Sequence, residues 1–525
     1  MSILNISTPG VYINEVNAFS NSVNAVATAV PAFIGYTPNA FYQGKSYNGK
    51  PTKISSFFDF QAIYCLPDAP LPASTTKQYN PQYYLVKQQS KPADKNYLVI
   101  NGVYYVVVPD PNTIYYLYNS IRLFYQNGGG DAYIVSVGSY GAPSGKPANQ
   151  GEQVVNPNIL LHDLQAGLQM LLNEDEPTMY ICPDATLLSI NDNATLMHSM
   201  LMQNAEMETA ISIFDIIGGK NPDPVYYTDD IKIFRENVGT HGLNFGAAYY
   251  PFVATTIMQA NEIDYTNIFG GDLKKLASII NPEDNPNQTV AAILNKITSS
   301  ISSASILQCN TELLNASSVY KAISDYILTD INILPPSGGM AGIITTIDSN
   351  EGVWQSPANT SIVGVVDLPI KLSESQQANL NVDAVTGKSI NAIRFFNGIG
   401  ILVWGARTLD GNSMDWKYIS VRRTMIMLEQ SCKRATQAYV FQPNTKITWE
   451  TVNSTISSFL TQIWKQGGIQ GANASEAFSV DCGLGITMTS DDILDSFMRV
   501  TVKVAIARPG EFIVFTFQQQ QVASS

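Results

Sequence analysis

The clearest pattern in the chain is an alternation of short apolar runs with longer stretches of helical periodicity. From Gly128 onward, strand-sized apolar runs occupy residues 132–137, 178–182, 210–215 and 243–250. Residues between and after them repeat at helical spacing, which predicts helices over 158–173, 192–208, 228–237, 287–298 and 317–330. This alternation predicts an α/β layer whose strands are largely parallel.

Other elements are predicted on both sides of this layer. Asn101-Gly102 stands between two apolar runs and predicts a hairpin over 97–108. The apolar residues of 421–439 are spaced 4, 3, 4, 3 and 4 apart, which predicts an amphipathic helix. Further helices are expected at 56–64, 114–126, 340–349 and 449–465, and further strands at 32–36, 401–405, 478–481 and 499–507.

The two ends of the chain carry apolar, extended segments without an obvious local partner. Residues 11–16 follow Pro9-Gly10, and residues 512–517 follow Pro509-Gly510. An unpaired strand is an aggregation hazard, and adding it to the sheet of a neighbouring subunit removes that hazard. Pairing of both ends within their own subunit is the alternative, and the pattern alone does not decide between the two.

Charge narrows the possible functions. The 525 residues carry a net charge of −13, which argues against a nucleic-acid-binding protein. Charged residues make up only 14% of the chain, so we expect much of the surface to be covered by other copies or by partners. Residues 388–470 contain ten basic and four acidic residues, which predicts one acidic partner surface.

Motifs for catalysis or ligand binding are weak. The three histidines do not stand at metal-ligand spacing, and the five cysteines form no Cys-x-x-Cys pair. Gly387-Lys388-Ser389 resembles the end of a phosphate-binding loop, but Val382 occupies the position that requires glycine. We therefore expect no catalytic residues, no metal and no cofactor. Neither a signal peptide nor a membrane-spanning run is apparent, so cytoplasmic assembly without membrane insertion is expected.

A series of segments resembles contractile tail sheath proteins. They are TPGVYINEV (8–16), FYQNGGGDAYIV (124–135), PPSGGMAG (335–342), GVWQSPAN (352–359), INAIR (390–394), VWGARTL (403–409), WKYISVRR (416–423), WKQGG (464–468) and ARPGEF (507–512). The resemblance is densest over about 335–520 and is greatest to the sheaths of extracellular contractile injection systems of the antifeeding-prophage kind. Phage tail sheaths and type VI secretion sheaths are relatives.

The resemblance implies a multi-domain α/β sheath fold. In it, extended N- and C-terminal strands exchanged between subunits complete a C-terminal α/β domain, and α/β middle domains are inserted. The implied divisions are an arm with the first core strand (1–35), an outer insertion (36–126), an outward-facing middle domain (127–385), a tube-facing core domain (386–509) and a C-terminal arm (510–525).

The resemblance also implies a function. Six subunits form a ring, rings stack helically around an inner tube, and contraction drives the tube through a target membrane. Baseplate and terminal cap proteins are the other implied partners, and the particle can be released from the cell. Implied strand-exchange residues are Val11, Tyr12, Ile13, Glu15, Phe512, Ile513, Val514 and Phe515. Arg422, Arg423, Lys433 and Arg434 are the candidates for contact with the inner tube. A myophage or type VI-like sheath subunit is the first alternative, and an α/β enzyme acting near Asp184 is a distant one.

Overall fold

The computed structural model describes residues 23–66, 77–92, 97–299 and 305–512. These residues form two compact units. Within the described part of the chain, the small unit consists of residues 23–26 and Met427–Ala507, and the large unit of the described residues of Ala27–Ile426 together with residues 508–512. The chain therefore passes between the two units three times, at residues 26–27, 426–427 and 507–508.

An eight-stranded sheet forms the centre of the large unit, in the order β16-β15-β11-β10-β9-β1-β8-β4. The pairs from β8 to β15 are parallel, whereas the edge strands β4 and β16 pair antiparallel. The strands are β1 (Pro31–Thr37), β4 (Thr52–Ile54), β8 (Ala132–Ser139), β9 (Met179–Ile181), β10 (Ile211–Asp215), β11 (Gly246–Tyr250), β15 (Asn391–Phe396) and β16 (Gly400–Val403). The predicted, largely parallel α/β layer is confirmed, and β1 lies inside it rather than at its edge.

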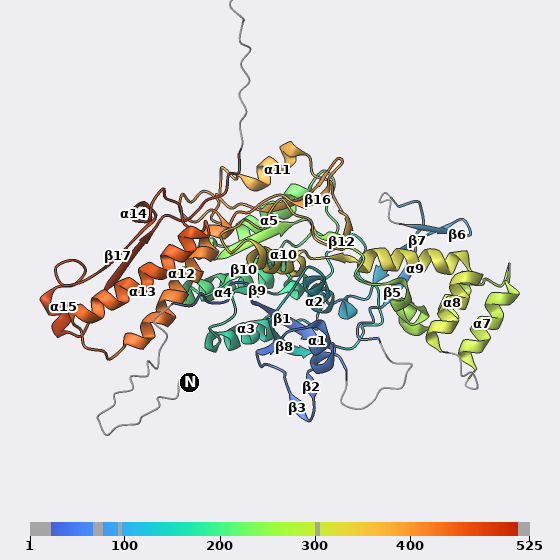
Figure 1. Ribbon diagram of the computed structural model, residues 1–525. Coiled ribbons are helices and arrows are strands. Elements are labelled where there is room, and N and C mark those ends of the chain that lie inside the picture. The colour runs from blue at the N-terminus through green and yellow to red at the C-terminus, as the bar shows by residue number, and fades with distance from the viewer. Residues whose placement is uncertain (1–22, 67–76, 93–96, 300–304, 513–525) are drawn as a thin grey trace, which may run out of the picture. The chain divides into compact units, whose positions relative to one another are not determined.

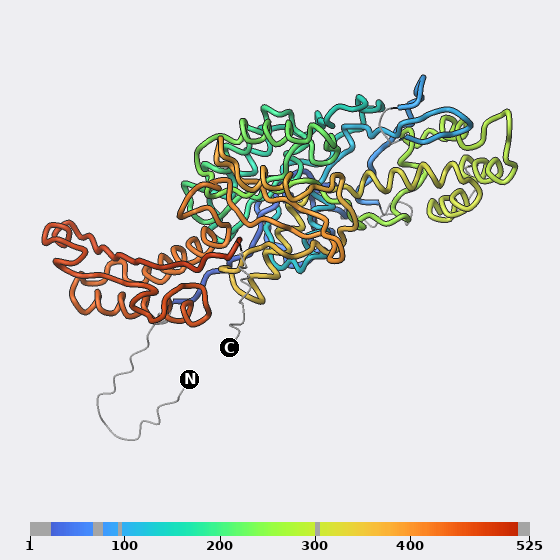
Figure 2. The backbone as a smooth tube through the Cα atoms, turned by 90° about the horizontal axis from the view of Figure 1, so that it is seen from above, coloured from blue at the N-terminus to red at the C-terminus, as the bar shows by residue number. Residues whose placement is uncertain are grey.

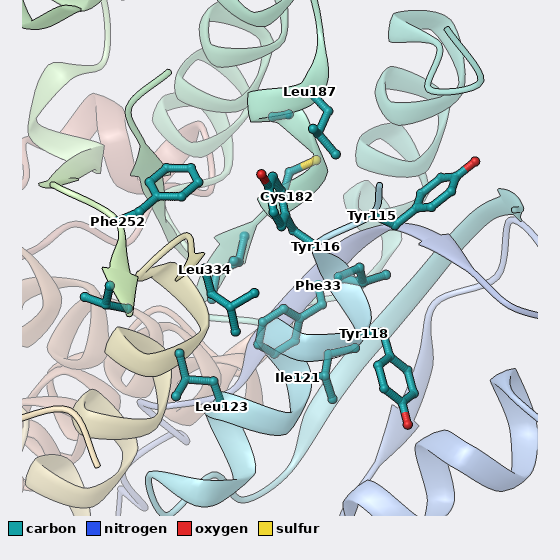
Figure 3. Packing of buried hydrophobic residues seen from close by; sticks show 14 of the residues in the cluster. Phe33, Tyr115, Tyr116, Tyr118, Ile121, Leu123, Cys182, Leu187, Phe252 and Leu334 are labelled. Carbon is teal, nitrogen blue, oxygen red and sulfur yellow. The ribbon is translucent and has the colours of Figure 1, made fainter. Parts of the chain in front are cut away.

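Helices cover both faces of this sheet (Figure 1). Neighbouring side chains on a strand point to opposite faces. Phe33 of β1 meets Phe124 of α2 (Leu117–Gln126), with ring centroids 5.4 Å apart. On the other face, the Cβ position of Gly167 in α3 (Leu161–Met170) lies 3.1 Å from the side chain of Ile34. Aromatic and aliphatic side chains therefore fill the layer between β1 and α2 (Figure 3).

The segment Pro335–Gly342 allows two helices to pack closely. Here α10 (Ser337–Asn350) lies against α2, and both contact the sheet. A Cβ atom on Gly338 would come within 2.3 Å of the Ser120 carbonyl oxygen, and one on Gly342 within 2.6 Å of the Phe124 carbonyl oxygen. Only glycine fits at such a distance, so this motif serves helix packing.

Smaller elements extend the large unit. β5 (Tyr83–Lys87), β7 (Val103–Pro109) and β6 (Leu98–Ile100) form an antiparallel sheet, and positive φ angles at Asn101 and Gly102 give the predicted hairpin turn. β12 (Val253–Thr255) pairs with β13 (Ile333–Leu334) and β14 (Val365–Asp367). β2 (Phe41–Tyr42) pairs with β3 (Lys45–Ser46). The remaining helices are α1 (Phe57–Tyr64), α4 (Ile190–Met207), α5 (Tyr227–Asn237), α6 (Leu273–Ile280), α7 (Gln288–Thr298), α8 (Ile306–Ala316), α9 (Ser318–Ile331) and α11 (Glu374–Asn381).

The small unit is a helical hairpin packed on two strands. It begins within α12 (Ile419–Thr436) and continues into α13 (Lys446–Lys465). α13 packs on β17 (Phe478–Cys482), which pairs antiparallel with β18 (Val500–Val504) (Figure 2). Val452, Ile456, Phe459 and Ile463 of α13 are buried. The short helices α14 (Ala474–Ala477) and α15 (Ser490–Leu494) complete it.

The elements predicted for the described residues are present, most with ends shifted by a few residues. Several elements were not predicted, among them the strands β4, β5, β12 and β15 and the helices α6, α8 and α11. β15 is the most consequential, because it places residues after 386 in the sheet of the large unit. The division at residue 386 therefore does not coincide with a boundary between the two compact units.

Candidate functional site at the roots of the two arms

The N-terminal root, residues 23–30, is held by a buried arginine. Arg423 of α12 donates a hydrogen bond from Nη2 to the carbonyl oxygen of Thr28, at 2.9 Å. The same guanidinium pairs with both carboxylate oxygens of Asp348 in α10, at 2.9 and 2.5 Å. These side chains are 3% and 4% exposed. The bidentate pair therefore lies inside the large unit and fixes the backbone of the root.

A second group of hydrogen bonds leads from this root into the sheet. The hydroxyl of Thr178 donates to the Thr28 carbonyl oxygen at 2.7 Å and accepts from the Val30 N–H at 3.0 Å. β1 begins one residue later, between β8 and β9. The N-terminal root thus continues directly into the centre of the large unit.

The C-terminal root, residues 508–512, is held by Glu511. Its carboxylate accepts hydrogen bonds from Arg407, with Nε 3.0 Å from Oε1 and Nη2 2.6 Å from Oε2. Asn381 Nδ2 and the hydroxyl of Tyr418 donate to the same carboxylate at 2.7 and 3.0 Å. We call Arg407, Asn381, Tyr418 and Glu511 the clamp.

The clamp stabilises the ionised form of Glu511. Burial alone would raise the pKa of its carboxyl group. The hydrogen bonds from Arg407, Asn381 and Tyr418, with the positive charge of Arg407, outweigh burial and lower that pKa below its usual value. Glu511 is therefore a carboxylate near neutral pH, and its charge is paired.

Two other buried carboxylates hold helix starts against the sheet. Asp184 accepts hydrogen bonds from the backbone N–H groups of Tyr36, Tyr116 and Leu117. Asp215 accepts from the N–H and the hydroxyl of Ser337, at the start of α10. Burial raises the pKa of Asp184 to about 6 and that of Asp215 to about 7. All of these hydrogen bonds are internal to the fold, so they assign both carboxylates a structural role.

The strand pair of the small unit has open edges. Among the described residues, β17 and β18 pair only with each other. Exposure alternates along β18, where Thr501 and Lys503 are exposed and Val500, Val502 and Val504 are partly buried. The strand pair packs against α13, and Asn453 of that helix donates a hydrogen bond to the Val480 carbonyl oxygen of β17. No third strand joins β17 or β18 within the described part of the chain.

The predicted strand-exchange residues lie mostly outside the described part of the chain. Val11, Tyr12, Ile13, Glu15, Ile513, Val514 and Phe515 are among the residues that the structure does not describe. Phe512 is described, and its side chain is 73% exposed. It follows directly after the clamp, so the described part of the chain ends with an exposed aromatic residue.

The four predicted tube contacts divide into two pairs. Lys433 and Arg434 are exposed in the last turn of α12. Arg422 and Arg423 are buried: Arg422 lies over the rings of Phe245 and Trp416, and Arg423 is paired as described above. The expectation that all four cations face a partner therefore needs correction for Arg422 and Arg423, whose charges lie inside the subunit.

The basic excess of residues 388–470 is also explained in part by cations that are buried inside the subunit. Lys388 and Arg407 are also buried, and Lys388 donates a hydrogen bond to the Arg235 carbonyl oxygen. The acidic partners of the buried arginines, Asp348 and Glu511, lie outside this stretch of sequence. Two positive charges of this excess are thus paired with acids inside the fold, which a count of signs along the sequence does not detect.

An exposed apolar group at the turn between α12 and α13 was not predicted. We call Val440, Phe441, Ile447 and Phe497 the tip. All four side chains are exposed, and Phe441 has a φ of +67°, in the left-handed region that disfavours aromatic residues. Asn444 joins the two loops by donating a hydrogen bond to the Phe497 carbonyl oxygen. In the sequence, the apolar residues at 440–441 and 447 are the feature from which this exposed group could have been predicted.

The described residues contain no cluster of three His, Cys, Asp or Glu side chains that could hold a metal ion. Within the same part of the chain, none of the helices has both the length and the apolar character needed to cross a membrane.

Comparison with known proteins identifies the family. Residues 412–520 match the phage tail sheath C-terminal domain, and residues 274–409 match the phage tail sheath protein central domain. The helical sheath of the anti-feeding prophage in its contracted state is 25% identical, covers 98% of this chain and 100% of its own, and has a TM-score of 0.57. The chain belongs to the contractile tail sheath family.

Further likenesses agree with this assignment. A chain of the anti-feeding prophage baseplate structure is also 25% identical, with a TM-score of 0.56 and coverage of 98% of this chain and 100% of that one. The sheath of an extracellular contractile injection system, PVC, is 23% identical, with a TM-score of 0.57 and 99% coverage of both chains, and shows the fold alone. The tail sheath protein of Vibrio phage KVP40 is 28% identical over 139 residues. They are 26% of this sheath protein and about a fifth, 20%, of that relative.

Proposed function

We propose that this sheath protein is the structural subunit of a contractile sheath. Six copies form a ring around an inner tube, rings stack helically, and contraction drives the tube through a target membrane. The observation that carries the proposal is the open β17–β18 hairpin in a chain whose two ends leave from anchored roots. The full-length likeness to a contracted sheath supports it.

The two arms would complete the hairpins of neighbouring subunits. Val11–Glu15 and Phe512–Phe515 carry the apolar residues that would pair at the edges of β17 and β18. Each backbone hydrogen bond contributes only about 0.5–1.5 kcal/mol, so a strand of five residues needs buried side chains as well. A subunit joined to different neighbours at its two ends would stay linked to them while the packing between subunits changes.

Lys433 and Arg434 remain the proposed contacts with the inner tube. Both are exposed, and their charge would attract an acidic tube surface. Residues 386–509 would face the tube, 127–385 would face outward, and 36–126 would form an outer insertion. Baseplate and terminal cap proteins would be the other partners, with neither nucleic acid nor inserted lipid. Assembly would occur in the cytoplasm, with later release of the particle.

An enzymatic role has no observation in its favour. Asp184, the acid on which such a role would depend, uses its carboxylate to hold three backbone N–H groups. We therefore infer a structural rather than a catalytic protein. A myophage or type VI-like particle would use the same sheath geometry and would differ in its tube, baseplate and anchoring.

Electron microscopy of the purified full-length chain tests the assembly. Rings or tubes are expected, and they should be lost when residues 1–20 or 513–525 are deleted. Circular dichroism should show that both truncated chains are folded, because the deletions leave both roots intact. Tubes formed by both truncated chains, or a full-length chain that stays monomeric at high concentration, would refute strand exchange.

The tube contact is tested separately. Lys433→Glu/Arg434→Glu should weaken co-assembly with the inner tube protein while leaving sheath polymers intact. The matched control is Lys274→Glu/Lys321→Glu, which makes the same charge change at exposed positions on α6 and α9. Equal co-assembly by both double variants would remove Lys433 and Arg434 from this role.

A further inference from the structure

The clamp offers an explanation for how the C-terminal arm is directed, a question that strand exchange leaves open. After β18 the chain returns to the large unit at Arg508, and the described residues end at Phe512, four residues later. Arg508 donates to the Met414 carbonyl oxygen at 2.7 Å and lies 3.6 Å from the carboxylate of Asp415, and both contacts are exposed. Glu511 is the more deeply held residue of the root.

The guanidinium that holds Glu511 is itself fixed in place. Arg407 and Tyr418 lie opposite each other in an isolated antiparallel bridge, and the side chains of both donate to the same carboxylate. Asn391, at the start of β15, accepts a hydrogen bond from the Arg407 N–H at 2.8 Å and donates to its carbonyl oxygen at 2.9 Å. The clamp is thereby connected to the eight-stranded sheet.

The burial of the pair distinguishes it from a surface ion pair. The Arg407 and Glu511 side chains are 6% and 21% exposed. Two donor nitrogens meet two acceptor oxygens, which fixes direction as well as distance. Exposed pairs contribute little to stability, whereas a partly buried, bidentate pair with two further donors holds a segment in one orientation.

We propose that Arg407 is a positioning residue that fixes the point at which the C-terminal arm leaves the large unit, by holding Glu511. The proposal rests on strand exchange by the arm. With the clamp closed, the arm starts at Phe512. With it open, about four more residues become free, which adds roughly 14 Å of reach and loses the direction of departure. A strand that must meet one edge on a neighbouring subunit gains effective concentration from a fixed origin.

The rate of cleavage by a glutamate-specific endoprotease measures how often the clamp opens. Such an enzyme must bind the Glu511 side chain, so cleavage after Glu511 requires the clamp to open first. Mass spectrometry of the released peptide 512–525 follows this one cleavage in the unassembled full-length chain. We expect Arg407→Gln to raise its rate at least about tenfold, because charge-assisted hydrogen bonds are lost.

Graded variants separate positioning from folding. Arg407→Lys keeps the positive charge but loses the two parallel donors of the guanidinium, so an intermediate cleavage rate is expected. Tyr418→Phe removes a single hydrogen bond and should raise the rate least. The control is Arg499→Gln, which breaks the more exposed pair with Asp492. It should leave cleavage after Glu511 unchanged. Wild-type cleavage as fast as in Arg407→Gln, with all chains folded, would overturn the clamp.

Assembly then distinguishes the two proposals. Arg407→Gln should assemble less than the wild type, with partial rescue in Arg407→Lys. If the chain lacking 513–525 still polymerises, strand exchange fails, although the protease result stands. If that deletion abolishes polymers but Arg407→Gln assembles normally despite fast cleavage, the arm functions without a fixed origin and the positioning role is wrong.

Discussion

The two roots use the same type of side chain in opposite ways. At the N-terminal root, Arg423 pairs with an acid of the body, Asp348, and holds the backbone of the root through Thr28. At the C-terminal root, the root itself supplies the acid, Glu511, and the body supplies Arg407. The first root thus remains anchored by an internal pair, whereas the second is anchored only while its own side chain stays bound.

The position of each root in the fold increases this difference. The N-terminal root continues into β1, which has a strand on each side in the large sheet. The C-terminal root follows the last strand, and side-chain contacts hold it. We therefore expect damage at the N-terminal root to destabilise the whole large unit. Damage at the C-terminal root should mainly release the arm.

The largest effect is expected from Arg423→Gln. The substitution leaves Asp348 as an uncompensated buried charge, and breaking such a pair costs about 3–5 kcal/mol. Denaturant unfolding of the unassembled chain measures the loss. Arg499→Gln, in the more exposed pair with Asp492, is the control and should leave the unfolding midpoint unchanged. Equal midpoints for both variants would contradict the distinction between the roots.

A smaller loss is expected from Asp184→Asn, at the other end of β1. The amide replaces one acceptor oxygen with a donor that faces backbone N–H groups, which costs about 1–3 kcal/mol for each group left unpaired. Hydrogen exchange at the amides of Tyr36, Tyr116 and Leu117 should accelerate with the drop in stability. Asp175→Asn, at an exposed position, is the matched control. Unchanged exchange at these amides would disprove the anchoring role of Asp184.

The sequence predicts the parts of this molecule that depend on local pattern. Apolar runs and helical spacing locate β1, β8, β10, α4 and α13 to within a few residues. β15 escaped prediction because Asn391 and Arg394 interrupt its apolar run. The side chain of Asn391 accepts a hydrogen bond from the backbone N–H of Arg407, a residue 16 positions away, and local pattern does not reveal this contact.

The roles of the arginines depend on distant residues, and sequence pattern does not reveal them. Arg423 and Asp348 are 75 positions apart, and Arg407 and Glu511 are 104 apart. A cation on an otherwise apolar helix looks the same in sequence whether it faces a partner or an internal acid. Only the fold shows that Arg422 and Arg423 are buried, which is why they are no longer proposed as contacts with the tube.

The next effect concerns pH and the C-terminal root alone. The clamp lowers the pKa of Glu511, so the pair contributes stability above the ordinary glutamate pKa of about 4.3, and loses it as the pH falls through the lowered value. Pepsin cleavage after Phe512, normalised to a reference peptide, should therefore rise as the pH is lowered from 5 to 3. In Glu511→Gln this rise should be absent, and the same rise in both chains would exclude Glu511 as the titrating group.

The smallest effect is expected at the tip, where an unfavourable backbone conformation lacks the internal contacts that both roots possess. Phe441 has a positive φ and an exposed ring, so the single chain gains nothing from the aromatic side chain. Asparagine tolerates this conformation, and Phe441→Asn should stabilise the isolated chain by up to about 1 kcal/mol. If the ring contacts another protein in the assembled particle, the same variant should assemble less well.

The matched variant Ile447→Asn separates these two consequences. Ile447 belongs to the same exposed tip but lies within α13, so its substitution relieves no strain. Both variants should reduce assembly, measured by sedimentation of polymers, and only Phe441→Asn should raise the unfolding midpoint. Full assembly by both would show that the tip contacts nothing. A loss of stability in Phe441→Asn would mean that the ring already has a role within the subunit, as the arginines at the roots do.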